Sequence, residues 1–544
     1  MLRWGLRWAS WRAGSVALAD ARRRDRSGLA TRLQLSRAWV WPTGIALAAV
    51  LVCLPFLRSV FGLADEGILL HGAARMARGQ VLYRDLFELY PPLGFFIVRL
   101  WTLVAGDSFV AARLLVVAAI AGIAVFTAMA CVRAGAGRGL ATALTLAWLV
   151  MSQGAWTIVD HHWFTTLALM GALWAALDLR RGARDRSPLL AGLAIGAAAM
   201  ITPPRGALAG LALAPGLWAG AGRVRRLALF VAGGAILPLL CLGWLVSQGA
   251  LAAAVEDLVV FPATQYSGIQ SVSWGRFAGP QDRLMALVFP AALLLAAVEA
   301  WRVRRTLLAD RRLCRAGLFA VAGFIGCFPR PDIVHIGFGL PLALPLLALC
   351  AQRLGRRLSR RTRLWSCALA AAACAPAVVA YGMTAAAVAT APTAPAWGVS
   401  LPLGATGEPE IAADLAALPR DARIFYYPYI PLTPALAGRV GVTPFDVYMP
   451  GYTTAAQYAR ACRDLMRDAQ WVVVDAPGTN PRLMKLIFPA LSGVRPPEER
   501  AFEIALDRGF PRVRQRGRFT LRRRGPAASD TLCAVASGAL PRGR

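Results

Sequence analysis

Residues 61–94 read "FGLADEGILLHGAARMARGQVLYRDLFELYPPLG" and set an Asp–Glu pair, Asp65 and Glu66, directly after an apolar run of membrane-spanning length. Two further acids, Asp85 and Glu88, lie shortly before a Pro–Pro pair. Charged groups at the end of a spanning helix are costly, although less so at the interface than at the bilayer centre, and they tend to be functional. We therefore expect the functional site to include this loop.

The composition indicates a polytopic α-helical membrane protein. Of the 544 residues, 57% are hydrophobic and only 16% are charged, whereas soluble domains carry about 25% charged residues. A net charge of +31 would also suit a nucleic-acid-binding protein. Many of the arginines, however, sit in short clusters between apolar runs, where cytoplasmic loops carry them. We therefore expect no nucleic-acid partner.

The apolar runs predict about eleven transmembrane helices. They lie near residues 39–57, 109–131, 139–152, 162–178, 188–201, 207–221, 227–247, 284–301, 316–328, 336–351 and 364–386. The N-terminal arm and every second loop after it are basic, around residues 22–26, 133–138, 180–186, 223–226, 302–312 and 353–363. By the positive-inside rule, the N-terminus is then cytoplasmic and the tail from about residue 387 is extracytoplasmic.

The expected organisation has three parts. Residues 1–37 form an Arg-rich cytoplasmic arm, residues 38–386 the transmembrane domain, and residues 387–544 a small extracytoplasmic α/β domain with an Arg-rich tail. Within the transmembrane domain, residues 58–108 form the first extracytoplasmic loop. Residues 66–79 have apolar side chains at helical spacing with Arg75 and Arg78 on another face, which predicts a helix lying on the membrane surface. Residues 93–106 are predicted as a second interfacial helix.

The tail alternates strand-like and helix-like stretches. Residues 422–431 and 470–478 are rich in aromatic and β-branched residues and predict strands. Residues 454–469 predict a helix between these strands, and residues 517–525 a closing strand. Cys462 and Cys533 lie in this tail, and they would be able to form a disulfide if it is outside the cytoplasm.

The polar groups that could carry chemistry all fall on the extracytoplasmic side. Besides Asp65 and Glu66 they are Asp160, His161 and His162 after the third span, and Arg330, Asp332 and His335 after the ninth. Asp and His are common metal ligands, so a divalent metal at Asp160, His161 and His162 stays open. Adjacent histidines at a helix end are expected to point apart, and a helix-capping role for Asp160 is the alternative.

Carboxylates outside the cytoplasm at membrane level suit one reaction in particular. No nucleotide is available there, so an activated donor must be tethered to the membrane, as polyprenyl-phosphate sugars are. Inverting glycosyl transfer needs a carboxylate that takes the acceptor proton as the anomeric carbon is attacked. It also needs cationic or hydrogen-bonding groups on the leaving phosphate.

Three stretches carry a resemblance to a known family. "ADEG…LYRDLFELYPPLGFF" followed by "GDSFVAARLL" resembles the first extracytoplasmic loop of the GT-C glycosyltransferases, in the branch of the protein mannosyltransferases and the lipid A aminoarabinose transferases (glycosyltransferase family 39-like). "FPRPDIVH" is similar to the Arg/Asp/His loop of bacterial members. The resemblance covers roughly residues 40–390 and implies a GT-C fold in a bacterial inner or plasma membrane.

The resemblance also implies roles for individual residues. Asp65 would be the general base, with Glu66 its alternate or partner, and Asp160 the second acid. Arg330 and His335 would bind the donor phosphate, and the further candidates for substrate binding are Asp332, Tyr90, Tyr83 and Glu88. Many members have lysine before the Pro–Pro pair, where this chain has Tyr90, which can only donate a hydrogen bond to a phosphate.

The expected partners are a polyprenyl-phosphate sugar donor, membrane lipids, and an extracytoplasmic acceptor that is a glycan, a lipid or a protein. No cofactor is certain. A transporter or flippase of lipid-linked intermediates stays open as an alternative, although transporters concentrate ionisable groups near the bilayer midplane. A GT-C scaffold without activity, serving envelope assembly, is the second alternative, and Tyr90 in place of lysine keeps it open.

Overall fold

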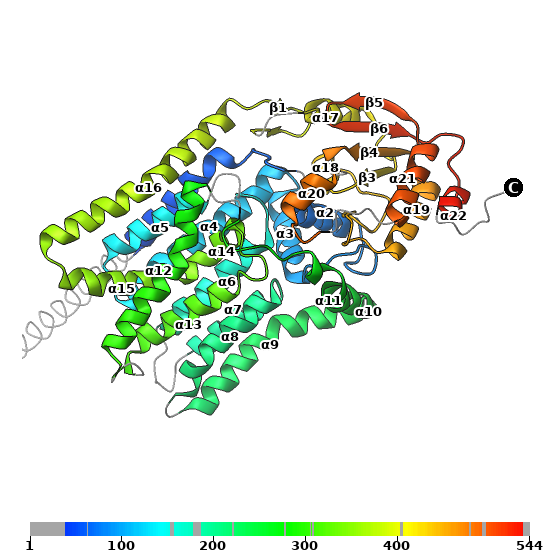
Figure 1. Cartoon of the computed structure of the whole chain (residues 1–544). Helices are drawn as coiled ribbons and strands as arrows, with labels where there is room; N and C mark the ends of the chain where they lie inside the picture. The colour runs from blue at the N-terminus through cyan, green and yellow to red at the C-terminus, as the bar shows by residue number, and fades with distance from the viewer. Residues whose placement is uncertain are drawn as a thin grey trace, which may run out of the picture.

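The computed structural model describes residues 39–536 apart from positions 63, 153–156, 178–185, 220–221, 277–278, 305, 307–308, 403–405, 478–479 and 492–496. The expected cytoplasmic arm, residues 1–37, and nearly all of the basic loop at 180–186 lie outside the described residues. Figure 1 shows a bundle of helices that carries a smaller part, built of strands and helices, at one end.

Every predicted apolar run coincides with a described helix, because helical backbone satisfies its own polar groups within an apolar environment. In chain order these helices are Trp39–Phe56, α4 (Phe109–Ala134), α5 (Arg138–Ser152), α6 (His161–Leu177), α7 (Ser187–Ala199), α8 (Pro203–Trp218), α9 (Arg223–Ser247), α12 (Pro280–Arg302), α13 (Arg311–Ile325), α14 (Ile333–Gly339) with α15 (Leu344–Arg357), and α16 (Arg360–Ala389).

Five of the described helices are long and apolar enough to cross a membrane by themselves: Trp39–Phe56, α4, α9, residues 282–302 of α12, and α16. The helices of the predicted span 336–351 pass the same test only as a pair and meet at an angle of 61°. The bend lies where Pro341 and Pro345 interrupt the helical hydrogen bonds. That this pair forms one span stays a prediction. The total of eleven crossings stays a prediction.

The loops that face the predicted extracytoplasmic side are themselves largely helical. The first loop holds α2 (Asp65–Ala77) and α3 (Pro92–Ala105), at the places where the sequence predicts two helices. The loop from 248 to 283 holds α10 (Leu251–Val255), a π-helical turn at Glu256–Val260, α11 (Phe261–Thr264) and a 3₁₀ turn at Tyr266–Gly268.

The C-terminal segment contains a four-stranded mixed sheet. The strand order is β3 (Ile424–Tyr427), β4 (Trp471–Asp475), β6 (Phe519–Arg523) and β5 (Arg512–Arg516), with β3 parallel to β4 and the other two pairs antiparallel. Its helices are α17 (Glu408–Ala417), α18 (Leu432–Leu436), α19 (Ala455–Asp468), α20 (Pro481–Ile487), α21 (Pro497–Gly509) and α22 (Thr531–Ala536). A two-stranded ribbon of β1 (Thr393–Ala394) and β2 (Val399–Ser400) precedes them.

The three strands and the helix predicted in the tail are therefore present, and the sequence analysis missed β5 of this sheet and the short β1–β2 ribbon. Its sequence "RVRQR" is too polar to read as a strand, and it pairs as the sheet's edge with β6. Alternate residues of β3 point to opposite faces of the sheet, as strand geometry requires. Tyr426 packs with α17 on one face, and Phe425 packs with α19 and α21 on the other. The domain boundaries stay a prediction.

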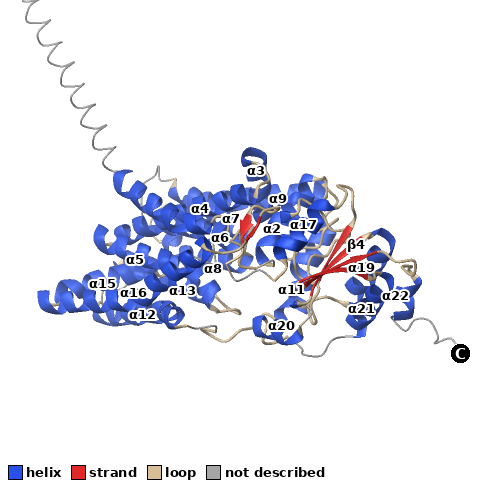
Figure 2. Cartoon of the chain, turned by 90° about the horizontal axis from the view of Figure 1, so that it is seen from above, coloured by secondary structure: helices blue, strands red, loops and turns tan. Residues whose placement is uncertain are grey.

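The sheet and α2 lie close together in space. Figure 2 shows the sheet at the end of the molecule opposite α12 and α15, and Figure 1 shows α2 between the bundle and the sheet. The contact between α2 and α18 is very close, because a Cβ at Gly67 would come within 1.9 Å of the Leu432 nitrogen. The first loop and the C-terminal segment are thus directly packed against each other.

Cys462 of α19 and Cys533 of α22 form a disulfide that closes a loop across a sequence separation of 71 residues. Cross-linking a loop of this length stabilises a fold by about 4 kcal/mol in the chain-entropy model. We expect Cys462→Ser to lower the midpoint of thermal unfolding of the C-terminal segment, measured by protease resistance during heating. Cys367→Ser, which changes an exposed free cysteine of α16, should leave the midpoint unchanged. Equal midpoints for Cys462→Ser and wild type would contradict the prediction.

Candidate functional site

Asp65 is the first residue of α2, where the helix dipole favours a negative charge. Its side chain is exposed, and its Oδ1 accepts a hydrogen bond of 2.6 Å from the hydroxyl of Tyr429. Desolvation by the surrounding protein raises the pKa of Asp65, and the hydrogen bond from Tyr429 lowers it by less. The side chain is thus accessible and partly desolvated by its neighbours, and it takes up a proton at a higher pH than an ordinary aspartate.

Charged groups from two further loops act on Asp65. Asp160, which precedes α6, raises the pKa of Asp65, and Arg330 and His335 from the segment around α14 lower it. Three loops that are far apart in the sequence therefore meet at one place. These are the loops in which the sequence predicts the site, and the set contains two carboxylates and two groups able to carry positive charge.

Asp160 caps α6, and it is joined by a row of aromatic rings. Its Oδ1 accepts a hydrogen bond of 2.7 Å from the His162 backbone nitrogen and lies 3.3 Å from His161 Nδ1. The ring centroids of His161 and His162 are 4.0 Å apart, with Tyr90 4.2 Å beyond His161 and His335 5.0 Å beyond His162. The expectation that the two histidines point apart is wrong, because rings from other segments pack on both sides of the pair.

The capping role predicted as the alternative for Asp160 is thus present, and it does not exclude a metal. The ligand atoms of Asp160, His161 and His162 lie within 4.8 Å of one another. His162 Nδ1 is buried and has no hydrogen-bond partner among the described residues. The group therefore fits a divalent cation in residue type and in spacing.

Asp332 connects the two cationic candidates. Its Oδ2 accepts a hydrogen bond of 2.8 Å from Arg330 Nε, and its Oδ1 lies 2.7 Å from His335 Nδ1. Burial alone would raise the pKa of Asp332, but the hydrogen bond from His335 and the charges of His335 and Arg330 bring it to about 2. Asp332 is therefore ionised at neutral pH and orients both side chains. Its role as a ligand for substrate stays a prediction.

One nitrogen of the Arg330 guanidinium, Nη1, is available to bind a ligand. Nη2 donates 2.9 Å to the Ile487 carbonyl oxygen, and the group lies 4.7 Å from the centre of the Phe488 ring. Nη1 is buried and has no hydrogen-bond partner among the described residues. An unpaired guanidinium nitrogen is costly, and an anionic ligand would satisfy it.

Glu66 has a different environment from Asp65. Both of its oxygens accept hydrogen bonds from Arg113: Nη2 donates to Oε2 at 2.7 Å, and Nε donates to Oε1. Oε1 also accepts a hydrogen bond of 3.0 Å from the Val159 backbone nitrogen. Arg113 also donates to the carbonyl oxygens of Phe56 and Ser59. The pair therefore joins the first span, α2, α4 and the loop before α6. With both oxygens bound to Arg113, Glu66 holds these elements together, and its role as the alternate or partner of Asp65 stays a prediction.

The remaining first-loop candidates divide between two places. Tyr90 stacks on His161 at the site, and burial followed by the charges of nearby acids raises its pKa. Tyr83 holds the backbone of Tyr90 through a hydrogen bond of 2.8 Å from its hydroxyl to the Tyr90 carbonyl oxygen. Glu88 is buried, and the groups that act on its pKa after burial are Asp446, Arg75 and Asp257. None of these groups is among those that shift the pKa of Asp65, and the role of Glu88 in substrate binding stays a prediction.

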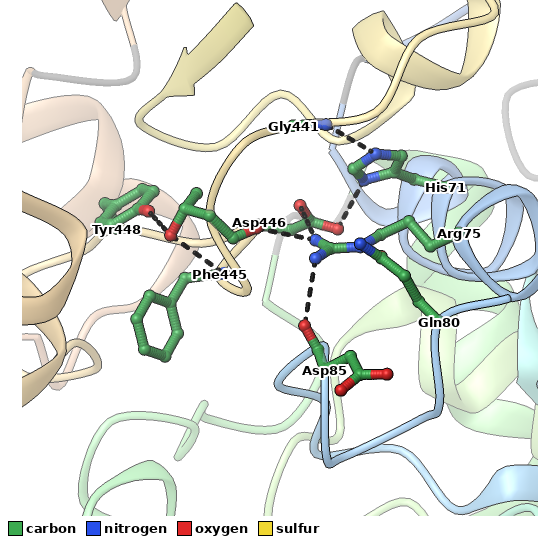
Figure 3. A network of polar contacts seen from close by, with 9 residues as sticks. His71, Arg75, Gln80, Asp85, Gly441, Phe445, Asp446 and Tyr448 are labelled. Carbon is green, nitrogen blue, oxygen red and sulfur yellow. Dashed lines mark hydrogen bonds and ion pairs between the residues drawn. The ribbon is translucent and has the colours of Figure 1, made fainter. Parts of the chain in front are cut away.

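The two arginines of the predicted basic face of α2 differ in the structure, since Arg78 is exposed and Arg75 is buried. Arg75 is only 2% exposed, and it donates to the carbonyl oxygens of Thr443 at 2.9 Å and Asp85 at 3.3 Å. Figure 3 shows Arg75 and His71 converging on Asp446, with His71 Nδ1 2.7 Å from its Oδ2. The C-terminal segment therefore covers part of α2 and supplies an ion partner for Arg75, a contact that the sequence did not predict. The position of α2 at the membrane surface stays a prediction.

Three residues that the sequence did not single out also surround the site. Tyr429 binds Asp65 directly. The charge of Asp65 acts on Tyr266, and the charge of Asp160 acts on Arg205. Arg205 lies next to a Pro–Pro pair at the start of a predicted span, on the same predicted side as Asp65, and this signal was available in the sequence. Tyr429 and Tyr266 carry no comparable signal, because only the tertiary packing of distant segments brings them to Asp65.

The geometry defines a polytopic helical membrane protein with a polar site where three loops and a C-terminal segment meet. No protein-family model and no curated protein sequence matches this chain. Among solved structures, ArnT from Cupriavidus metallidurans bound to undecaprenyl phosphate matches with a TM-score of 0.57 and 17% identity, over 90% of this chain and 98% of that one.

The apo state of the same ArnT matches with a TM-score of 0.54 and 18% identity, over 92% of this chain and 99% of that one. A complex of the Archaeoglobus fulgidus oligosaccharyltransferase with Zn and sulfate matches with a TM-score of 0.49 and 12% identity, over 81% of this chain and 69% of that one. The ArnT matches extend over nearly the whole of both chains. They confirm the GT-C fold that the sequence resemblance implies.

Proposed function

We propose that this protein is an integral-membrane glycosyltransferase that moves a sugar from a polyprenyl-phosphate donor to an extracytoplasmic glycan, lipid or protein, with inversion at the anomeric carbon. The observation that carries the proposal is the accessible carboxylate of Asp65 in electrostatic contact with Arg330, whose buried Nη1 has no hydrogen-bond partner in the part of the chain that the structure describes. A base and an anion-binding cation in one place are the two groups that such a transfer requires. The shared fold with an ArnT that binds undecaprenyl phosphate supports the donor class.

In the proposed step, Asp65 accepts the proton of an acceptor hydroxyl. The acceptor oxygen forms a bond to the anomeric carbon while the bond from that carbon to the donor phosphate oxygen breaks. The leaving polyprenyl phosphate keeps the electron pair of the broken bond. The proton stays on Asp65 until solvent removes it, and the raised pKa makes the carboxylate a better proton acceptor than an ordinary aspartate.

The negative charge that develops on the leaving phosphate needs fixed donors. Arg330 offers Nη1, and His335, whose Nδ1 lies 2.7 Å from Asp332 Oδ1, would donate from Nε2 in its doubly protonated form. Charge-assisted hydrogen bonds of this kind are about twice as strong as neutral ones. Tyr90 adds a neutral hydroxyl where related proteins carry a lysine. The site then relies on Arg330 for its cation at the phosphate.

Asp160, His161 and His162 would hold a divalent cation if one binds. Such an ion would supply positive charge beside the donor phosphate. The proton transfer to Asp65 does not depend on it.

The proposed membrane orientation has the N-terminus in the cytoplasm and the site and the C-terminal segment outside it. The alternation of basic loops supports this orientation. The Cys462–Cys533 disulfide also supports it, because disulfides persist in oxidising compartments and are rare in the cytosol.

A transfer assay tests the proposal. The purified protein in lipid is incubated with a panel of radiolabelled polyprenyl-phosphate sugars and an extract of the cell envelope, and donor binding is measured in parallel. Transfer of label to an extractable product with inverted anomeric configuration is the expected result. Donor binding without transfer across the panel would contradict the proposal and favour the inactive scaffold. Movement of donor across the bilayer without transfer would favour the flippase.

Removing the cation should weaken donor use selectively. We expect Arg330→Gln to raise the KM for the donor by about 10- to 100-fold, because a charge-assisted hydrogen bond contributes about 1.5–3 kcal/mol. Arg283→Gln, at an exposed arginine of α12 on the same predicted side, is the control and should leave the KM unchanged. An unchanged KM in Arg330→Gln, with folding retained, would remove Arg330 from the donor site.

A further inference from the structure

The contact between Tyr429 and Asp65 joins parts of the chain that are 364 residues apart. Tyr429 follows β3 and precedes α18, so it belongs to the C-terminal segment. Its hydroxyl donates to Oδ1 of Asp65 at 2.6 Å. No bond to the second carboxylate oxygen, Oδ2, is found among the described residues. One oxygen of the carboxylate is thus engaged, and the other is left for a ligand.

The segment that carries Tyr429 is held firmly against the helix that carries Asp65. Pro428 and Pro431 restrict the backbone on both sides of Tyr429. Two residues into α2, Gly67 lies so close to Leu432 that an added Cβ would come within 1.9 Å of the Leu432 nitrogen and 2.2 Å of the Pro431 carbonyl carbon. Tyr429 and Asp65 therefore keep their relative positions unless this whole interface separates.

The same interface has a second set of polar contacts further along α2. His71 and Arg75 bind Asp446 of the C-terminal segment, and Arg75 also donates to the Thr443 carbonyl oxygen (Figure 3). These buried contacts lie two and three turns beyond Asp65 on the same helix. The C-terminal segment is thus attached to α2 at two points, and Tyr429 lies at the point nearest the site.

We propose that Tyr429 is a positioning residue of the active site, which holds Oδ1 of Asp65 so that Oδ2 faces the acceptor hydroxyl, and that the C-terminal segment thereby completes the catalytic centre. This inference rests on the proposed function and adds a role for a part of the chain outside the transmembrane bundle. Gly67 is needed for this contact, because only a residue without a Cβ allows the two backbones to come this close.

A hydrogen bond to the charged form of an acid stabilises that form. Desolvation raises the pKa of Asp65, and Tyr429 offsets part of this rise. The other groups that face Asp65 come from four more elements and stay in place when the Tyr429 hydroxyl is removed: they are Asp160, His161, Arg330, His335, Tyr90 and Tyr266. The effect of losing the hydroxyl can therefore be assigned to Tyr429.

The test is Tyr429→Phe, which removes the hydroxyl and keeps the ring. The acid limb of the pH–rate profile should move up by about one pH unit, because a hydrogen bond to a charged group contributes about that much to a pKa. At a pH above the acid limbs of both wild type and Tyr429→Phe, the kcat of the variant should be about tenfold lower, since Asp65 loses its orientation. The KM for the donor should not change, because Tyr429 does not touch the donor-phosphate groups.

Tyr426→Phe is the matched control. Tyr426 lies three residues before Tyr429, and its hydroxyl is buried and has no hydrogen-bond partner among the described residues. Its removal should leave the pH profile and kcat as in wild type. If Tyr429→Phe also leaves both unchanged, the proposal is overturned. If Tyr429→Phe raises kcat, the hydroxyl blocks the acceptor instead of orienting the base, and the proposal is equally overturned.

A second measurement does not depend on activity. Water-soluble carbodiimide labels protonated carboxyl groups, and the label on Asp65 can be followed by mass spectrometry as a function of pH. The midpoint should lie higher in Tyr429→Phe than in wild type and Tyr426→Phe. A shared midpoint in all three proteins would overturn the inference. If the midpoint moves as expected while wild type transfers no sugar, the contact with Asp65 is supported and the proposed function fails separately.

Discussion

Asp65→Asn is expected to lower kcat for sugar transfer by about a thousandfold, the scale of general-base catalysis. Asparagine has nearly the same shape and still accepts the hydrogen bond from Tyr429, but it cannot take the acceptor proton. Because Asp65 is not proposed to touch the donor phosphate, donor affinity should be retained. The measurement is the rate of transfer at saturating donor, together with donor binding by the same preparation.

The pH dependence of wild type gives a second view of the same residue. The pKa of Asp65 is raised above that of an ordinary aspartate. As the pH is lowered, Asp65 therefore becomes protonated at a higher pH than an ordinary aspartate would. Transfer should therefore decline on the acid side at a higher pH than it would with an ordinary aspartate as the base. In Asp65→Asn this limb should be absent from the residual rate.

Asp107→Asn provides the matched control, since Asp107 is an exposed acid of the same first loop. It should transfer at the wild-type rate. Equal rates for Asp65→Asn and wild type would remove Asp65 as the base. Asp160, the other carboxylate at the site, would then be the next residue to test.

The largest effect on stability is expected at Arg113. The Arg113 and Glu66 side chains are 0% and 3% exposed, and each is the principal partner of the other. Removing one member of a buried ion pair leaves an uncompensated charge and costs about 3–5 kcal/mol. Arg113→Met should therefore lower the folded fraction and the thermal midpoint of the protein in detergent, measured by size-exclusion chromatography after heating.

Two further variants separate this effect from simple loss of contact. Replacing both residues, Arg113→Met with Glu66→Met, should recover part of the loss, because apolar pairs often substitute for buried ion pairs. Arg84→Ala breaks the exposed pair with Asp85, whose side chains are 47% and 32% exposed, and should cost less than about 1 kcal/mol. If Arg113→Met and Arg84→Ala have the same thermal midpoint, the ion pair of Arg113 and Glu66 does not hold the fold together.

The sequence by itself determined the architecture of the membrane part and the region of the site. Apolar runs of spanning length leave helices as the favoured structure, so each predicted run coincides with a helix. Asp65, Asp160 and Arg330 could be predicted to share a side of the membrane because each follows a span whose direction the basic loops predict. The strands of the tail were predictable because β-branched and aromatic residues cluster in them, whereas the arginine-rich β5 has no such local signal.

Only the tertiary structure decided which polar groups face the site and which hold the fold. Asp65 and Glu66 are neighbours in sequence, yet a helix turns successive side chains by about 100°, so one meets Tyr429 and the other meets Arg113. Arg75 looks like a surface residue in the helical pattern and is buried because Asp446, 371 positions away, compensates its charge. Local periodicity records which residues are apolar, but the partner of a charged residue is set by segments that meet only when the chain has folded.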